Sequence, residues 1–253
     1  MCQNIKDKIV LITGASSGLG KQFAQTLSLE GAIVILAARD KNKLQVLSES
    51  LKSKGGKVFL VSLDVRSPES IENCIQFINE KLGRLDVLIN NAGISIEKYI
   101  IDNNIDDYNN LMETNLRGSW LVAKYVGQYM IKEKISGKII NITSVLGKNV
   151  IPMLSLYSMS KAAILQMTKS MALEWSRYNI KVNALSPGFI ETPMNKNYFL
   201  TERGKKQILK WPGRKLGHPN DLEGVILFLC GDYSSFINGS EITIDDGQSL
   251  KGL

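Results

Sequence analysis

Tyr157 and Lys161 are the residues with the clearest chemical potential, and Ser144 stands 13 positions before the tyrosine. A spacing of four on a helix places two side chains on one face, one turn apart, so a phenol and an ammonium can serve the same small site. Such a site could reduce a carbonyl, a reaction in which carbon receives a hydride and oxygen receives a proton. On its own the pair is a weak signal, because a half-buried tyrosine beside a solvated lysine is common on helices.

A glycine-rich turn, TGASSGLG at residues 13–20, follows an apolar run and opens a helical pattern. In that context glycines allow the backbone to approach a pyrophosphate, and the helix N-terminus offers N–H donors to it. The alternative is a tight strand-to-helix turn without a ligand. Together with the Tyr–Lys pair, the turn predicts a dinucleotide site.

Two other chemistries share letters with this turn. Residues 14–18 match the G-x-S-x-G elbow of serine hydrolases, but that elbow lies deeper in those chains, and the only histidine here is His218. A Walker A loop is disfavoured because Gln22, which follows Gly20 and Lys21, has no hydroxyl for magnesium.

Short β-branched runs alternate with longer helical patterns along the chain, which is typical of parallel strands joined by crossover helices. The pattern predicts strands at residues 8–13, 33–37, 57–62, 87–89, 138–143, 181–185 and 241–244. It predicts helices at about 18–30, 41–53, 68–82, 105–132, 155–178 and 220–231. We expect an α/β protein with a single-domain Rossmann fold: a doubly wound, seven-stranded parallel sheet with helices on both faces.

Composition fits one domain over residues 1–253, since 44% of the residues are hydrophobic and 22% charged. The best apolar run, 224–230, is far short of the ~20 residues that cross a bilayer. Residues 1–8 are polar and do not resemble a signal peptide. We therefore expect a cytoplasmic protein without a membrane partner.

The number of cysteines and the distribution of charge argue against several further classes of protein. Cys2, Cys74 and Cys230 are scattered and odd in number, which argues against a disulfide framework, and a single histidine leaves too few ligands for zinc. We expect no protein-bound metal. The net charge of +7 is spread over many helices, not gathered with aromatic residues, so a nucleic-acid partner is disfavoured.

In their order along the chain, these motifs resemble the short-chain dehydrogenase/reductase family, nearly from end to end. After the glycine turn come NNAG at 90–93, Asn115, then Ser144, Tyr157 and Lys161 at the family's spacing, PG at 187–188 and DDG at 245–247. The resemblance implies an NAD(P)-dependent oxidoreductase that interconverts a carbonyl and a secondary alcohol. A noncatalytic NADP-binding regulator is a remote alternative, because such a protein could lose Tyr157 or Lys161.

The resemblance also implies roles for four catalytic residues. Tyr157 is the general acid, or the base in oxidation. Lys161, with the positive nicotinamide ring, lowers the pKa of the phenol and binds the nicotinamide ribose. Ser144 hydrogen-bonds the substrate oxygen, and Asn115 anchors a water that relays protons from Lys161.

Cofactor contacts are implied residue by residue. Asp64 is expected to meet the adenine amino group, and Asn91 to lie under the adenine ribose. Ile190 and Thr192 are expected near the carboxamide. The whole expected set is Gly14, Ser16, Ser17, Gly18, Leu19, Gly20, Arg39, Asp64, Val65, Asn91, Ala92, Gly93, Tyr157, Lys161, Pro187, Gly188, Ile190 and Thr192.

Cofactor choice depends on the end of the second strand. An acid there would bind the ribose hydroxyls of NAD and repel a 2′-phosphate. Here Ala38 takes that place and Arg39 follows, and a guanidinium can grip phosphate in a fork. We expect NADP(H) to be favoured over NAD(H). The alternative is that Arg39, followed by Asp40, is only a solvated helix start.

The substrate is less constrained. Residues 191–213 carry several aromatic side chains and are expected to form a lid, with Ile96, Leu146, Met153 and Phe189 as mostly apolar pocket neighbours. The motif set most resembles bacterial 3-oxoacyl-acyl-carrier-protein reductases, with gluconate 5-dehydrogenase-like enzymes as the alternative.

Two kinds of partner follow from the resemblance. In the acyl-carrier enzymes, basic residues near two helix ends dock the acidic carrier. Lys134 and Arg177 lie one residue from those places, which Ile135 and Tyr178 occupy, and Lys132 adds a third cation. We also expect a homotetramer assembled through the two long helices and the C-terminal strand.

Overall fold

All seven expected strands form one parallel sheet in the computed structural model, which describes residues 5–251. Residues 1–4, with Cys2, and 252–253 lie outside the described part. The strand order is β3-β2-β1-β4-β5-β6-β7, and every neighbouring pair is parallel. The strands are β1 (Ile9–Thr13), β2 (Ile33–Ala38), β3 (Lys57–Ser62), β4 (Val87–Asn90), β5 (Lys138–Ile142), β6 (Lys181–Pro187) and β7 (Glu241–Ile244).

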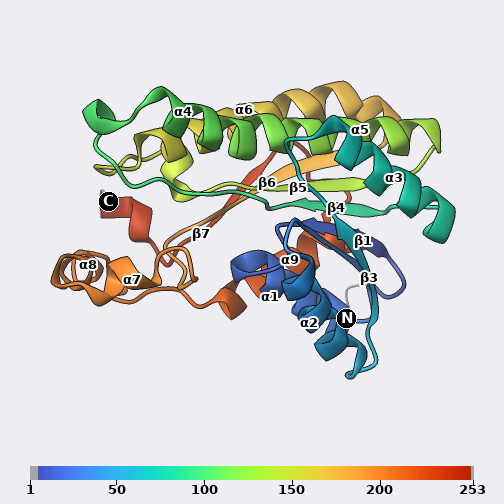
Figure 1. Ribbon diagram of the computed structural model, residues 1–253, viewed down its shortest axis with the longest axis horizontal. Helices are drawn as coiled ribbons and strands as arrows, with labels where there is room; N and C mark the ends of the chain where they lie inside the picture. Colours follow the sequence, from blue (N-terminus) through green and yellow to red (C-terminus); the bar gives the residue numbers. More distant parts are fainter. Residues whose placement is uncertain (1–4, 252–253) are drawn as a thin grey trace.

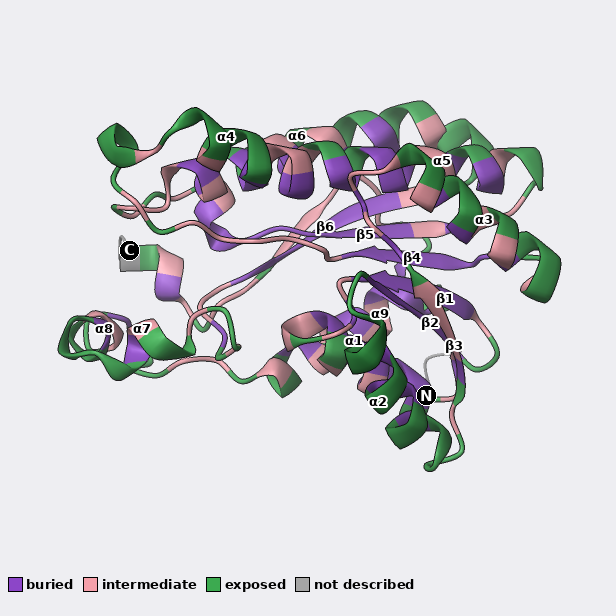
Figure 2. Ribbon diagram, in the orientation of Figure 1, coloured by how far each residue is buried: buried purple, intermediate pink, exposed green. Residues whose placement is uncertain are grey.

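Helices cover both faces of this sheet (Figure 1). One layer holds α1 (Gly18–Leu29), α2 (Lys41–Lys52) and α9 (Glu223–Cys230), and the other holds α3 (Pro68–Leu82), α4 (Ile105–Met112), α5 (Gly118–Lys132) and α6 (Ser155–Trp175). Because strand side chains alternate between faces, Val10 and Ile12 enter the core with α1, while Ile9 and Leu11 enter the core with α3. The central strands are buried along their length (Figure 2).

The observed elements differ from the expected ones mainly at helix ends. The expected helix 105–132 is interrupted by a π-helical turn, η2 (Glu113–Arg117), between α4 and α5. Residues 176–178, expected to extend α6, form a 3₁₀ turn, and so do Pro219–Leu222 before α9. Hydrophobic periodicity locates a helix but does not distinguish α, π and 3₁₀ turns at its ends.

The carboxyl ends of the strands gather the loops that carry the expected site. A doubly wound sheet places such loops at the edge where the chain switches direction, here between β1 and β4. Residues 191–213 fold as a helical hairpin, α7 (Lys196–Leu200) and α8 (Glu202–Ile208), outside the two main layers (Figure 1).

Residues 5–251 show neither a membrane-spanning helix nor a cluster of metal-ligating side chains. No helix there is long and apolar enough to span a bilayer. Within the same part of the chain, no three His, Cys, Asp or Glu side chains gather as metal ligands would. Cys74 and Cys230 are both buried free thiols.

Candidate active site

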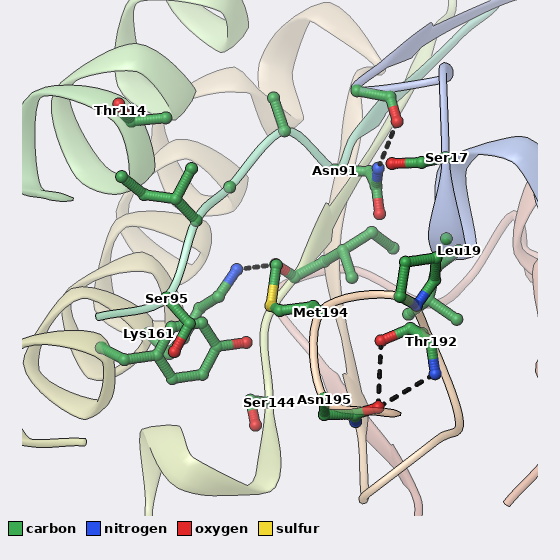
Figure 3. A pocket seen from close by; sticks show the side chains of 18 of the residues that line it. Ser17, Leu19, Asn91, Ser95, Thr114, Ser144, Lys161, Thr192, Met194 and Asn195 are labelled. Atoms are coloured by element: carbon green, nitrogen blue, oxygen red, sulfur yellow. Dashed lines mark hydrogen bonds between the residues drawn. The ribbon is translucent and has the colours of Figure 1, made fainter. Parts of the chain in front are cut away.

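A cavity of about 810 Å³ opens at the carboxyl edge of the sheet. It runs from the glycine turn to the lid hairpin, and Figure 3 shows Ser17 and Asn91 on one side of it and Ser144 and Lys161 on the other. Of the expected site residues, those lining it are Gly14, Ser16, Ser17, Gly18, Leu19, Arg39, Asp64, Val65, Asn91, Ala92, Gly93, Ser144, Tyr157, Lys161, Pro187, Gly188, Ile190 and Thr192. Gly20 and Asn115 lie behind its wall.

The glycine turn fits a pyrophosphate. Gly14 and Gly18 have φ of 66° and 53°, the left-handed region that glycine adopts without steric cost. Ser17 caps α1 without a side-chain hydrogen bond, so among the described residues 5–251 its side chain leaves the N–H groups of the first turn available to a ligand. A Cβ on Gly20 would lie 2.4 Å from the Gly14 carbonyl oxygen, so this glycine permits the close packing of helix against turn.

Asn91 and Thr13 join the glycine turn to the end of β4. The Asn91 side-chain amide donates to the Thr13 carbonyl at 3.0 Å, and the Thr13 hydroxyl accepts from the backbone N–H groups of Asn91 and Ala92 at 2.9 and 3.0 Å. Thr13 is fully buried, so both of these hydrogen bonds are shielded from water. These bonds fix the two loops that form one wall of the cavity.

The far end of the cavity is the end that lies away from Tyr157, next to Arg39 and Asp40. Positive side chains there outnumber the carboxylates that have no cation partner. Asp40 caps α2 by accepting from the Lys43 backbone N–H at 3.0 Å, and its other oxygen pairs with the Lys43 ammonium at 3.2 Å. These hydrogen bonds lower the pKa of Asp40. Arg39 lines the cavity, and no ion pair engages its guanidinium among residues 5–251.

Asp64 is also paired, by a residue that the sequence did not single out. The Arg66 guanidinium donates to both Asp64 carboxylate oxygens, at 3.2 and 3.0 Å, and the Arg66 backbone N–H adds a third bond. This fork lowers the pKa of the Asp64 carboxyl group. Arg66 itself lines the cavity, so two guanidinium groups border its far end.

Ser144, Tyr157 and Lys161 converge at the near end. Lys161 is buried, donates from Nζ to the Ile142 carbonyl at 2.8 Å, and lies 5.5 Å from the centre of the Tyr157 ring. Ser144 lies two residues after the end of β5, and its Oγ accepts from the Leu146 backbone N–H at 3.1 Å. The spacing of four on α6 therefore brings the phenol and the ammonium to one site, as the sequence predicts.

Burial shifts both of these groups toward their neutral forms. Desolvation raises the pKa of Tyr157 to about 12, against a smaller opposing effect of the nearby Ser144 hydroxyl. Desolvation lowers the pKa of Lys161 to about 8. In the protein alone burial thus disfavours the charged form of each group, and the prediction that Lys161 and the positive nicotinamide ring together lower the pKa of the phenol applies to the cofactor-bound state.

Asn115 lies on the π-helical turn, fully buried. Its Oδ1 accepts from the Ile94 backbone N–H at 2.8 Å and its Nδ2 donates to the Ile94 carbonyl at 2.9 Å. The Asn115 side chain thus makes a pair of hydrogen bonds with the backbone of Ile94, as a neighbouring β-strand would. A Cβ on Gly93 would lie 3.3 Å from Asn115 Oδ1 and 3.8 Å from Lys161 Nζ, so both groups flank this glycine.

The near end of the cavity is mostly apolar. Leu146, Met153 and Phe189 line it as expected, whereas Ile96 does not. Phe189 stacks on Trp211 with ring centres 5.0 Å apart, and Phe199 meets both rings edge to face. These aromatic contacts pack two parts of the lid, α7 and the segment after α8, against Phe189.

Several residues that line the cavity carried no signal in the sequence. They come from irregular loops and the lid, where neither periodicity nor a motif identifies them: Arg66, Ser95, Glu97, Asn195 and Arg203. Figure 3 shows Asn195 bonded to Thr192, with Oδ1 accepting from the Thr192 N–H at 3.0 Å.

The sequence is similar to those of known oxidoreductases. A family model described as "Enoyl-(Acyl carrier protein) reductase" matches residues 14–249. A 3-oxoacyl-[acyl-carrier-protein] reductase of Thermotoga maritima is 38% identical over 96% of this chain and 98% of its own length. An NAD-dependent glycerol dehydrogenase of Listeria innocua is 34% identical over 98% and 96%.

Solved structures agree as well. A gluconate 5-dehydrogenase from Burkholderia cenocepacia, in complex with NADP and tartrate, superposes with a TM-score of 0.93 at 31% identity, covering 97% of this chain and 96% of that one. The matched sequence spans the glycine turn, the Ser–Tyr–Lys cluster and β7. The chain is therefore an oxidoreductase of the short-chain dehydrogenase/reductase family.

Proposed function

We propose that the protein is an NADP(H)-dependent oxidoreductase that interconverts a carbonyl and a secondary alcohol. The observation that carries this proposal is the convergence of Ser144, Tyr157 and Lys161 at one end of a cavity whose other end is a glycine turn. The bound nicotinamide would supply or accept the hydride. The protein must then orient the carbonyl and move one proton.

Each catalytic side chain has a distinct part in the proposal. Ser144 donates a hydrogen bond to the substrate oxygen and holds it beside Tyr157. The Tyr157 hydroxyl gives its proton to that oxygen during reduction, and the phenolate takes it back during oxidation. Lys161 stabilises the phenolate and binds the ribose, and Asn115 keeps the loop at Ile94 in place for the relay of protons to solvent.

The cofactor preference rests on charge at the far end of the cavity. Asp40 and Asp64 are each neutralised by a hydrogen-bonded cation, while Arg39 is left to meet a 2′-phosphate. Gly14, Ser16, Ser17, Gly18 and Leu19 would hold the pyrophosphate. We propose NADP(H) as the preferred cofactor.

The substrate is proposed to be a 3-oxoacyl thioester. The near end of the cavity is lined mainly by apolar side chains, among them Leu146, Ile151, Leu154, Met194 and Phe199, which suits an acyl chain better than a bare sugar. The lid at about 191–213 is proposed to close over the bound chain and exclude water.

Arg203 favours a second candidate, a sugar-acid dehydrogenase. It lines the cavity from α8, and among residues 5–251 its guanidinium meets only the Met153 sulfur, at 3.9 Å. A guanidinium free of ion pairs is suited to a substrate carboxylate.

A carbonyl panel separates these two functions. NADPH consumption is measured with an acetoacetyl thioester, a carrier-bound 3-oxoacyl chain, 5-ketogluconate and a simple diketone. Selective turnover of the thioesters supports the first candidate. Turnover of the keto sugar acid alone, lost in Arg203→Met, supports the second, and no turnover of any carbonyl would contradict both.

Carrier docking at Lys132, Lys134 and Arg177 is part of the first candidate. All three side chains are exposed, but Arg177 lies 16 residues beyond Lys161, about 24 Å along the helix axis at ~1.5 Å per residue. Reversing the three charges should raise the KM for a carrier-bound substrate and leave that for a free thioester unchanged.

We propose a homotetramer in the cytoplasm. Tyr108 and Trp120 are 41% and 43% exposed and line a groove across α4, η2 and α5, where a second copy would cover them. Light scattering of wild type and Trp120→Asp tests this assembly: the variant should dissociate. A wild-type chain that is monomeric at assay concentration would contradict it.

A further inference from the structure

Glu241, at the start of β7, has a side chain only 10% exposed and lies near the catalytic end of the sheet without a part in the chemistry above. A buried carboxylate is stable only when cations and hydrogen bonds satisfy it. Here each oxygen has a partner. Ser186 donates to Oε1 at 2.7 Å, and the Lys148 ammonium pairs with Oε2.

The hydrogen bonds continue from Ser186 to β5. The Thr143 and Ser186 hydroxyl oxygens are 2.5 Å apart, and both residues are buried. Since the Ser186 proton is directed to Glu241, Ser186 must accept from Thr143, whose proton is shared with the Leu185 carbonyl at 3.0 Å. The carboxylate is the final acceptor of a chain that crosses from β7 through β6 to β5.

Both ends of this network lie beside Ser144. Thr143 immediately precedes it, and Lys148 follows the single turn, η3 (Val145–Gly147), that Ser144 caps. Glu241 therefore holds the residues on each side of Ser144, one through Ser186 and one through the ion pair. Within residues 5–251, the Ser144 hydroxyl contacts no side chain of the sheet: its Oγ accepts from the Leu146 N–H inside the same turn, and it lies near the Tyr157 hydroxyl on α6.

We propose that Glu241 is a positioning residue for Ser144, acting through Ser186–Thr143 on one side and Lys148 on the other. This inference rests on the proposed role of Ser144 as the donor to the substrate oxygen. A displacement of a catalytic donor by about 1 Å can lower the rate about 100-fold. Loss of the carboxylate should therefore lower kcat and leave the cofactor end of the cavity unaffected.

The test is a double-mutant cycle on the full-length protein. Glu241→Ala should lower kcat about 10- to 100-fold with the best carbonyl of the panel, with the KM for NADPH unchanged. Glu241→Gln keeps an oxygen for Ser186 and should restore much of the rate. In a Ser144→Ala background, Glu241→Ala should change kcat by less than about 2-fold, since there is no hydroxyl left to position.

Lys148→Met provides the second arm if Glu241→Ala does not fold, because it releases one side of the turn only. It should also lose its effect in the Ser144→Ala background. Asp7→Asn is the matched control: it breaks the 2.8 Å Lys57–Asp7 pair beyond the opposite edge of the sheet and should leave kcat unchanged.

Two results would overturn the inference, and they are distinguishable from failure of the proposed function. An equal loss of kcat with and without the Ser144 hydroxyl would show that Glu241 only stabilises the sheet. A higher KM for NADPH in Glu241→Ala would show that its effect is not confined to Ser144. If Ser144→Ala alone is as active as wild type, the proposed role of Ser144 is wrong and the positioning role falls with it.

Discussion

Replacing Lys161 by methionine should reduce the population of Tyr157 phenolate about 100-fold when the oxidised cofactor is bound. In the protein alone the pKa of the phenol is about 12, so only about one molecule in ten thousand is ionised near pH 8. A general base is most efficient when its pKa lies near the working pH. Bringing the phenolate into that range requires about 5 kcal/mol of preferential stabilisation, at ~1.4 kcal/mol per pH unit.

Lys161 can supply only part of this free energy. Its ammonium lies 5.5 Å from the centre of the ring over which the phenolate charge is delocalised. At an effective dielectric constant of about 20, Coulomb's law gives about 3 kcal/mol for that separation, which is about a 100-fold effect on the ionised population. The positive ring of the oxidised cofactor must provide the remainder.

The assay is the tyrosinate absorbance band of wild type minus that of Tyr157→Phe, which cancels the other seven of the eight tyrosines. We expect this band in mildly alkaline solution with the oxidised cofactor and not with the reduced one. In Lys161→Met it should be lost over the same pH range. A band of equal size with either cofactor, or an unchanged band in Lys161→Met, would refute the electrostatic reasoning.

Three further predictions concern the cofactor and stability. Arg39→Ala should lower kcat/KM for NADPH about 10- to 100-fold relative to NADH, because a charge-assisted hydrogen bond contributes about 1.5–3 kcal/mol; an unchanged ratio in steady-state kinetics would contradict this. Gly20→Ala should lower the free energy of unfolding by about 1–3 kcal/mol in urea titrations, because its Cβ would lie 2.4 Å from the Gly14 oxygen. Burial lowers the pKa of Lys161 from 10.5 to about 8, so between these pH values the unfolded chain binds more protons than the folded one, and the contribution of Lys161 to stability rises with pH. Lys161→Met should therefore raise the Tm of the cofactor-free protein below about pH 8, and this gain should be lost above about pH 10.5. A gain in Tm that does not depend on pH would contradict this prediction.

Sequence reasoning located the sheet because parallel strands that are covered on both faces are mainly apolar along their length, as β1 is from Ile9 to Ile12. It also predicted that Tyr157 and Lys161 share one site, since a spacing of four on a helix fixes the phenol and the ammonium on the same face, and both line one cavity with Ser144. The π-helical turn at Asn115 was not predicted, because one extra residue in a turn leaves no mark on hydrophobic periodicity.

Features that depend on tertiary contact were beyond the sequence. The Arg66–Asp64 fork and the Glu241–Lys148 pair join groups whose orientation is set by loops. The rise in the pKa of Tyr157 in the cofactor-free protein was also beyond the sequence, because desolvation depends on how tightly the two walls of the cavity enclose the phenol.

We propose that Tyr157 transfers the proton in a carbonyl reduction driven by NADPH. The most direct test of this proposal compares kcat for NADPH consumption in wild type and Tyr157→Phe with the best carbonyl of the panel, alongside the Kd for NADPH measured by fluorescence. We predict that kcat falls by about 100- to 10,000-fold, the range for loss of a general acid, while the Kd is unchanged. A Tyr157→Phe variant as active as wild type would contradict the account.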